Sequence, residues 1–268
     1  MPTARVNGIK MYYEVHGKGD PLVLIHGSCF DVNGWAGQLD EFSKRYRVIV
    51  FDNRGVGRTD SPAPPYSTEE MATDTTGLMD ALDIDRAHIL GFSMGGCIAQ
   101  ELAVRDPGRV RSLILAGTAA RMSPVGMART LLFLRMLKEG VSPEIVMHNF
   151  MLWLFSDKFF ENHENVTAAV QNYMNNPYPQ PIDGLEGQAV ASVEHDTRGR
   201  FEHITAPTMV VVGGEDILLP VKLSRELAAG IAGSELIIVE EAGHGLPLEA
   251  PERFNRVVLD FLARVDKA

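Results

Sequence analysis

The 268-residue sequence is poor in cysteine and in positive charge. Its two cysteines, Cys29 and Cys97, are too few for a disulfide framework and lack the Cys/His spacing of a metal site, so we interpret both as small buried residues. The net charge of −10 argues against nucleic acid or an anionic membrane surface as a partner. No apolar run is long enough to span a membrane, and the N-terminus lacks the apolar core of a signal peptide. We therefore expect a cytoplasmic protein.

The composition, with 45% hydrophobic and 22% charged residues, is typical of a globular protein, and the chain is long enough to form one large core. Short apolar runs, typical of strands buried on both faces, alternate with helical patterns. The runs lie at residues 22–25, 48–51, 89–90, 113–115, 208–212 and 236–239. This order predicts a parallel α/β sheet with helices on both faces, preceded by a β-hairpin over residues 6–15.

The alternation is interrupted between about Arg121 and Arg200, where Met, Phe and Leu recur at helix spacing without any strand run. We interpret residues 121–200 as a helical cap over the C-terminal edge of the sheet, with residues 1–120 and 201–268 as the core. An independent second domain is the alternative. We favour the cap because a segment of this length, with both ends rejoining one sheet, depends on the core for its stability.

Residues 91–95 read Gly-Phe-Ser-Met-Gly and stand between an apolar strand run and a helical pattern. Strand, tight turn and helix is the context in which Gly-x-Ser-x-Gly forms a nucleophile elbow. Such a turn holds Ser93 in a strained conformation that lifts its hydroxyl clear of the sheet. It also aims the N-terminus of the following helix at developing negative charge. The alternative is an ordinary serine in a glycine-rich loop.

A serine hydroxyl needs a base within hydrogen-bond reach, and that base needs an orienting acid. Of the eight histidines, His244 has the best setting, because it lies between glycines just after the last strand run. Asp216 follows the run at residues 208–212 and is the candidate acid, with Glu215 as its direct rival. We therefore predict Ser93, Asp216 and His244 as catalytic residues, in the chain order that α/β-hydrolase triads have.

Attack on a carbonyl creates an oxyanion, which needs preorganised donors worth roughly 3–4 kcal/mol each. The backbone N–H of Met94, the residue after the nucleophile, is the first predicted donor. The second is expected from the loop that follows the strand run at residues 22–25. We assign it to the N–H of Ser28 and keep Cys29 as the alternative.

With these residues the chain resembles the α/β-hydrolase superfamily, and in detail the group of serine esterases and proteins similar to 3-oxoadipate enol-lactonase. The resemblance covers almost everything from Val6 to Leu262. It rests on His26-Gly27, Asp52-x-Arg54-Gly55-x-Gly57, Gly91-x-Ser93-Met94-Gly95-Gly96, His195-Asp196-Thr197-Arg198, Asp216 and His244. It implies an α/β-hydrolase fold, with a mostly parallel eight-stranded sheet, helices on both faces and an inserted helical cap, and it implies no cofactor. Haloalkane dehalogenases and epoxide hydrolases have aspartate where this chain has Ser93, so we do not expect their activities.

We predict a serine hydrolase that cleaves a carboxylic ester or lactone of a small, hydrophobic substrate through an acyl-enzyme. The partner is thus a small molecule, and the protein is expected to be a monomer or a homodimer without a metal ion. The residues predicted to bind the substrate, between the serine and the cap, are Phe30, Trp153, Phe155, Leu218 and Leu246.

Three other functions stay open. The same triad hydrolyses carbon–carbon bonds in β-diketones or ring-cleavage products. Cofactor-free perhydrolase activity is a second alternative, although related enzymes favour aromatic-Pro-Leu where this chain has Ser28-Cys29-Phe30. The third is a non-catalytic binding module, which commonly lacks a member of the triad.

Overall fold

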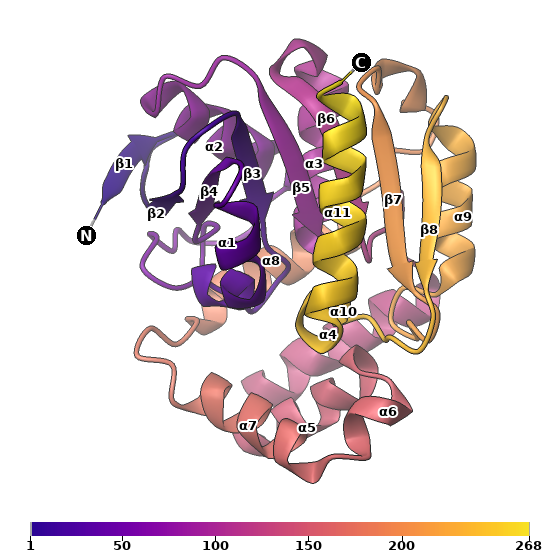
Figure 1. Cartoon of the computed structure of the whole chain (residues 1–268). Helices are drawn as coiled ribbons and strands as arrows, with labels where there is room; N and C mark the ends of the chain where they lie inside the picture. The colour runs from indigo at the N-terminus through magenta and orange to yellow at the C-terminus, as the bar shows by residue number, and fades with distance from the viewer. Residues whose placement is uncertain (1, 268) are drawn as a thin grey trace.

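The computed structural model describes residues 2–267, and eight strands in it form a single sheet (Figure 1). The strands are β1 (Thr3–Val6), β2 (Ile9–His16), β3 (Pro21–Ile25), β4 (Arg47–Phe51), β5 (Ala87–Phe92), β6 (Val110–Ala116), β7 (Thr208–Gly213) and β8 (Glu235–Val239). Their order is β1-β2-β4-β3-β5-β6-β7-β8. Strands β3 to β8 run parallel, whereas β1 and β2 form an antiparallel hairpin at one edge. The predicted mostly parallel, eight-stranded sheet is confirmed.

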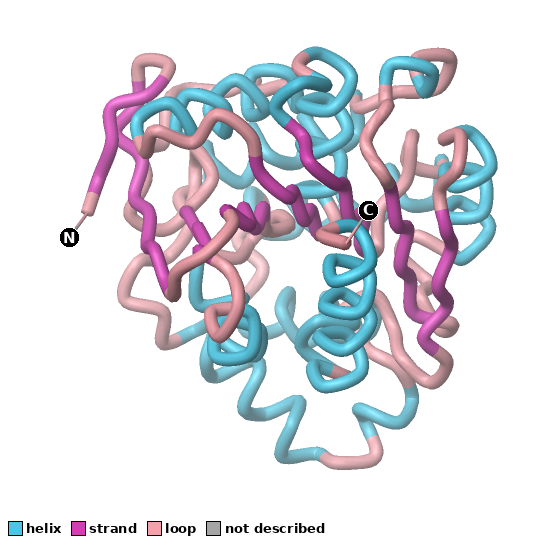
Figure 2. The backbone as a smooth tube through the Cα atoms, turned by 45° about the horizontal axis from the view of Figure 1, so that its top comes forward, coloured by secondary structure: helices cyan, strands magenta, loops and turns pink. Residues whose placement is uncertain are grey.

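Helices cover both faces of the sheet, as Figure 2 shows. The covering helices are α1 (Ala36–Phe42), α2 (Thr68–Ala81), α3 (Met94–Arg105), α9 (Val221–Gly230) and α11 (Pro251–Val265), with the short α10 (Leu246–Glu249) before the last. Side chains of β3 alternate between two apolar cores because consecutive residues of a strand point to opposite faces. Val23 and Ile25 pack under α2, α3 and α9, whereas Leu22 and Leu24 pack under α1 and α11.

Five further helices stand between β6 and β7 in the sequence. They are α4 (Pro124–Lys138), α5 (Pro143–Leu154), α6 (Asp157–Phe160), α7 (His163–Met174) and α8 (Ile182–Glu194), and we call them the inserted helices. In Figure 1, α4 to α7 lie beyond the arrowheads of β7 and β8, at the C-terminal ends of the parallel strands. A third apolar core joins them to the loops there. The domain boundaries at residues 120 and 200 stay a prediction.

Local sequence explains where several of these helices begin. The hydroxyl of Ser67 accepts a hydrogen bond from the N–H of Glu70 at 3.1 Å and so caps α2. Ser123 caps α4 in the same way through the N–H of Gly126, and proline occupies the first position of α4, α5 and α11. Within residues 2–267, no helix combines the length and apolarity that a membrane crossing requires.

Candidate active site

Ser93 stands at the turn between β5 and α3, with backbone angles φ 54° and ψ −120°. A positive φ is strained for a residue with a side chain, and here the turn is fixed by a hydrogen bond from the N–H of Ser93 to the carbonyl of Ala116 at 2.9 Å. Close backbone approach requires glycine on both sides. A Cβ at Gly91 would lie 2.2 Å from the carbonyl oxygen of Gly95, and one at Gly95 would lie 2.0 Å from that of Ile25.

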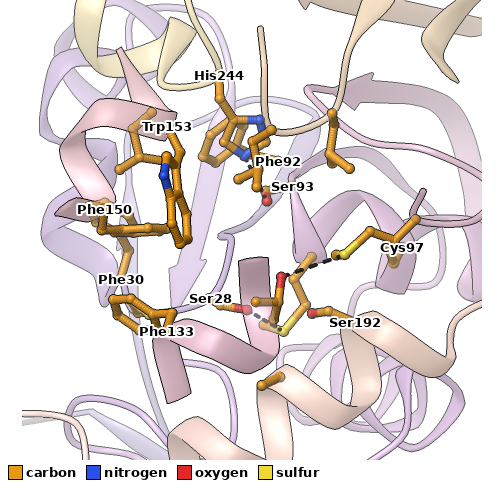
Figure 3. Close-up of a pocket in the computed structure, with 18 of the residues that line it drawn as sticks. Ser28, Phe30, Phe92, Ser93, Cys97, Phe133, Phe150, Trp153, Ser192 and His244 are labelled. Atoms are coloured by element: carbon orange, nitrogen blue, oxygen red, sulfur yellow. Dashed lines mark hydrogen bonds between the residues drawn. The ribbon is translucent and has the colours of Figure 1, made fainter. Parts of the chain in front are cut away.

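The structure brings His244 and Asp216 to this serine, although they lie far from it in the sequence. Nε2 of His244 lies 3.0 Å from Oγ of Ser93 (Figure 3). Nδ1 of the same ring lies 2.8 Å from Oδ2 of Asp216. Both side chains are buried. The second oxygen of Asp216 accepts the N–H of Leu219 at 2.7 Å, which fixes the carboxylate in the loop after β7. A hydroxyl, an imidazole and a carboxylate thus form one continuous chain of hydrogen bonds.

Glu215, the rival acid, points elsewhere. Its side chain is exposed, while its backbone N–H donates to the carbonyl of Ala242 at 2.9 Å. That bond ties the loop after β7 to the loop that carries His244. The structure therefore places Asp216, and not Glu215, beside the imidazole.

The two predicted oxyanion donors, Ser28 and Met94, lie side by side on the wall of one cavity. The hydroxyl of Ser28 donates to Sδ of Met94 at 3.2 Å. Met94 is the first residue of α3, where a backbone N–H has no partner within the helix. The N–H of Cys29, the alternative donor, is directed to Oε1 of Gln188 at 3.4 Å, whereas that of Ser28 meets no acceptor among residues 2–267. This arrangement favours Ser28 over Cys29.

His26 helps to fix the loop that follows β3 and carries Ser28. Its Nδ1 accepts the N–H of Gly27 at 2.8 Å, and its carbonyl accepts the side-chain amide of Asn53 at 3.0 Å. Burial lowers the pKa of His26 to about 4, so the ring is neutral at neutral pH. It packs between Trp35 and Phe30, with ring centroids 4.7 and 4.9 Å away. His26 therefore has a structural place and does not compete with His244 as a base.

The cavity next to Ser93 is small, with a volume of about 80 Å³. Phe30, Trp153 and Leu218, three of the residues predicted to bind the substrate, line this cavity, and Phe133 and Phe150 are two further aromatic residues that the sequence did not single out. Figure 3 shows these aromatic rings on one side of the cavity, with Cys97 and Ser192 on the other. Its lining contains no Lys, Arg, Asp or Glu.

Two predicted pocket residues do not line this cavity. Leu246 is the first residue of α10, and it is fully buried in the core between the sheet and α11. Phe155 follows the last residue of α5, where the chain turns, and its ring stacks on Phe159 at 3.9 Å. Neither position follows from the sequence, which does not show how α10 and the inserted helices are oriented against the sheet.

One group of side chains has the composition of a metal site but lies far from Ser93. Asp20, His88 and Asp266 bring their ligand atoms within 4.8 Å of one another at the start of β5, the end opposite to the serine. Arg111 already pairs with both carboxylates, at 2.7 and 3.1 Å. The guanidinium already balances the charge of these carboxylates, and through Asp266 the cluster ties the C-terminal end of α11 to the sheet.

Known proteins resemble this chain over nearly its whole length. The chain is 30% identical to "Putative carbamate hydrolase RutD" of Azorhizobium caulinodans, over 100% of both chains. It is 31% identical to 2-hydroxymuconate semialdehyde hydrolase of Pseudomonas sp. (strain CF600), over 97% of this chain and 93% of that one. The solved structure of the enol-lactonase from Burkholderia xenovorans LB400 matches with a TM-score of 0.87 at 29% identity, over 98% of this chain and 100% of that one.

A family model described as alpha/beta hydrolase fold matches residues 20–251. That range runs from the start of β3 to the start of α11 and includes Ser93, Asp216 and His244. The inserted helices fall within it as well. The chain therefore belongs to the α/β-hydrolase family.

Proposed function

We propose that the protein is a serine hydrolase that cleaves a small carboxylic ester or lactone through an acyl-enzyme. The observation that carries this proposal is the hydrogen-bonded series from Ser93 through His244 to Asp216, with distances of 3.0 and 2.8 Å. Such a series is the arrangement that activates a serine hydroxyl for attack on an acyl carbon.

In the first half-reaction, Oγ of Ser93 bonds to the acyl carbon while its proton passes to Nε2 of His244. The N–H groups of Ser28 and Met94 hold the negative oxygen of the tetrahedral intermediate. The bond to the alcohol oxygen then breaks, and His244 returns its proton to that oxygen. Asp216 fixes the orientation of the imidazole and stabilises its cationic form.

In the second half-reaction, a water molecule gives its proton to His244 and attacks the acyl-enzyme. The intermediate collapses to release the carboxylic acid and to return the proton to Ser93. Both steps use the same base and the same oxyanion donors, so the site needs no further catalytic group.

The cavity supports a small, uncharged acyl group. Its volume of about 80 Å³ is roughly half of the ~150 Å³ of an apolar cavity that takes up benzene. The lining offers hydroxyls from Thr130 and Ser192 but no charged side chain to pair with a carboxylate on the substrate. One solved relative is an enol-lactonase, and this supports the lactone part of the proposal.

The test is hydrolysis of short p-nitrophenyl esters by wild type and by Ser93→Ala, together with labelling by a fluorophosphonate probe. We expect Ser93→Ala to lose several powers of ten in kcat and to lose the label, as removal of a nucleophile does. A variant with a near-normal rate would reject Ser93 as the nucleophile. An unlabelled wild type that is also inactive on every ester would reject the proposal as a whole.

Carbon–carbon bond hydrolysis is the second candidate, and the observation that favours it is the 31% identity to 2-hydroxymuconate semialdehyde hydrolase. The same three side chains serve both reactions. Assaying a β-diketone and a ring-cleavage product beside the esters separates them. A higher kcat/KM on either carbon substrate would replace the ester proposal.

A further inference from the structure

A second, larger cleft of about 570 Å³ opens beside the catalytic cavity. One of its sides is the loop at residues 29–34, and the other sides come from α5, α6 and α7. Cys29 and Phe30 line both spaces. Because these two residues directly follow Ser28, the cleft and the catalytic cavity have part of a wall in common, on the loop that carries the predicted oxyanion donor.

Part of the lining of this cleft is apolar. Met147 and Met151 are buried on α5, and Phe155 and Phe159 stack on each other at 3.9 Å beside them. Thioether side chains adapt their shape to a partner, and stacked rings offer a flat surface. This part of the lining is suited to an aromatic ring or a short hydrocarbon chain.

The lining of the cleft also includes a group of side-chain amides. Each amide offers two donors and one acceptor without a net charge. The asparagines in the cleft are Asn33, Asn165, Asn172, Asn175 and Asn176. Most come from α7 and the turn that follows it, and those at positions 165, 172 and 175 are exposed to solvent. A ligand with an amide or hydroxyl group would find hydrogen-bond partners here.

The cleft has little charge to offer a ligand. Among its lining residues Asp31 is the single charged one, and both of its oxygens are already used. Oδ1 accepts the N–H of Asn33 at 2.9 Å, and Oδ2 accepts the side-chain amide of Asn176 at 3.0 Å. No Lys or Arg lines the cleft, so a carboxylate on the ligand would meet a negative charge and no positive one.

We propose that this cleft binds the alcohol half of the ester, and that this half is an uncharged group combining an aromatic or aliphatic body with an amide or hydroxyl. The inference rests on the proposed ester hydrolysis. A cavity of about 80 Å³ accommodates a short acyl group only, so any larger substrate must extend beyond it. The cleft that shares Cys29 and Phe30 with it has about 570 Å³, a volume within the usual range of ligand sites.

Three acetate esters test the assignment, because they share an acyl group that fits the small cavity. Ethyl acetate is too short to enter the cleft, 4-acetamidophenyl acetate carries the proposed ring and amide, and 4-carboxyphenyl acetate carries a charge in the same place. We expect kcat/KM for the acetamide ester to exceed that for the carboxylate ester by about tenfold or more. Equal values for these two aryl esters would overturn the uncharged class.

Ala168→Trp places a large ring in the cleft from an exposed position on α7. We expect it to lower kcat/KM for 4-acetamidophenyl acetate by about tenfold and to leave ethyl acetate within about twofold of wild type. Gln171→Trp adds the same ring at an exposed position on the same helix that does not line the cleft, and it should change neither value. An Ala168→Trp enzyme that changes both esters equally, or neither, would overturn the proposal.

Binding of the free alcohol tests the cleft without requiring that the enzyme hydrolyse an ester. Calorimetry with 4-acetamidophenol on Ser93→Ala should show binding that the added Ala168→Trp abolishes and that Asn172→Leu weakens by roughly fivefold. Asn172→Leu, on the exposed side of α7, serves if the tryptophan variant does not fold. A wild type that hydrolyses no ester but binds the alcohol would refute the reaction alone, whereas ester hydrolysis without such binding would refute the cleft alone.

Discussion

At the scale of single residues, Asp216 and Glu215 allow a direct comparison, because these adjacent acids differ in burial and only Asp216 contacts His244. Asp216→Asn keeps the shape of the side chain but favours the wrong tautomer of His244. We expect kcat to fall by roughly 10⁴-fold while the protein stays folded. Steady-state kinetics on a p-nitrophenyl ester, with circular dichroism as the check on folding, measures this. Glu215→Gln is the matched control and should stay within about twofold; the reverse pattern would exchange the two roles.

Gly95 presents a purely steric prediction. A methyl group there would lie 2.0 Å from the backbone oxygen of Ile25, so the turn or β3 would have to shift. We expect Gly95→Ala to lower the free energy of unfolding by about 3 kcal/mol, the upper part of the range for overpacking. Gly108→Ala is the control, because its Cβ would meet no atom within 4 Å, and it should be neutral or slightly stabilising. Urea unfolding measures the stability of both variants. Equal midpoints for Gly95→Ala and Gly108→Ala would contradict the predicted steric clash at position 95.

The residues around the serine divide into those that sequence can locate and those it cannot. Ser93, Asp216 and His244 each lie in the loop or turn that follows a strand, and parallel strands bring their C-terminal ends to one edge of the sheet. Their proximity is thus a consequence of topology. Phe155 and Leu246 are different, since their directions depend on how a helix is rotated and where it turns, and no local pattern encodes either.

At the scale of elements, the loop that carries His244 is bound to the inserted helices on both sides of the histidine. The N–H of Gly245 donates to the carbonyl of Leu154 at 2.6 Å. On the other side, the carboxylate of Glu249 accepts the N–H of Gly243 at 2.8 Å and the N–H and hydroxyl of Ser156. The end of α5 thus helps to hold the imidazole in place.

Glu249 is therefore expected to act as a positioning residue for His244. Glu249→Ala leaves the N–H groups of Gly243 and Ser156 without their acceptor and should lower kcat by about tenfold while KM changes little. Glu249→Gln retains a carbonyl oxygen and should recover part of the loss. The control Glu252→Gln alters an exposed glutamate on α11, for which no ion pair is found within residues 2–267. A Glu249→Ala enzyme that is less stable but has an unchanged kcat would show that the contact is structural only.

The sequence predicts the order of the strands and helices better than it predicts how they pack. Continuous apolar runs mark parallel strands because both faces of such a sheet are covered, and Ser67 marks the start of α2 through its hydroxyl. The inserted helices carry apolar residues at helix spacing too, yet several large ones stay exposed, including Val125, Ile145 and Leu152. Apolar spacing alone therefore does not reveal which face of these helices meets the cavity.

At the scale of the whole molecule, stability depends on pH through buried histidines. Burial lowers the pKa values of His26 and His195 to about 4, from an ordinary value of 6.5. Between pH 6.5 and pH 4 these two imidazoles bind protons in the unfolded chain but stay neutral in the native state. The native state therefore loses stability as the pH falls from 6.5 to 4. Burial raises the pKa values of Asp52, Asp74 and Glu101, and these acids act in the opposite direction.

A single histidine variant separates these opposing contributions. His195 is buried where the inserted helices rejoin the sheet, with Nδ1 at 3.1 Å from the hydroxyl of Thr68 and 3.7 Å from Glu101. His195→Asn removes the ionisable imidazole. The free energy of unfolding of wild type, relative to that of the variant, should therefore fall by about 3 kcal/mol between pH 7 and pH 4. Urea unfolding at several pH values measures this difference. His203→Asn replaces an exposed histidine and serves as the matched control. A stability difference for His195→Asn that stays constant across this range would mean that burial of the neutral imidazole is not what links the fold to pH.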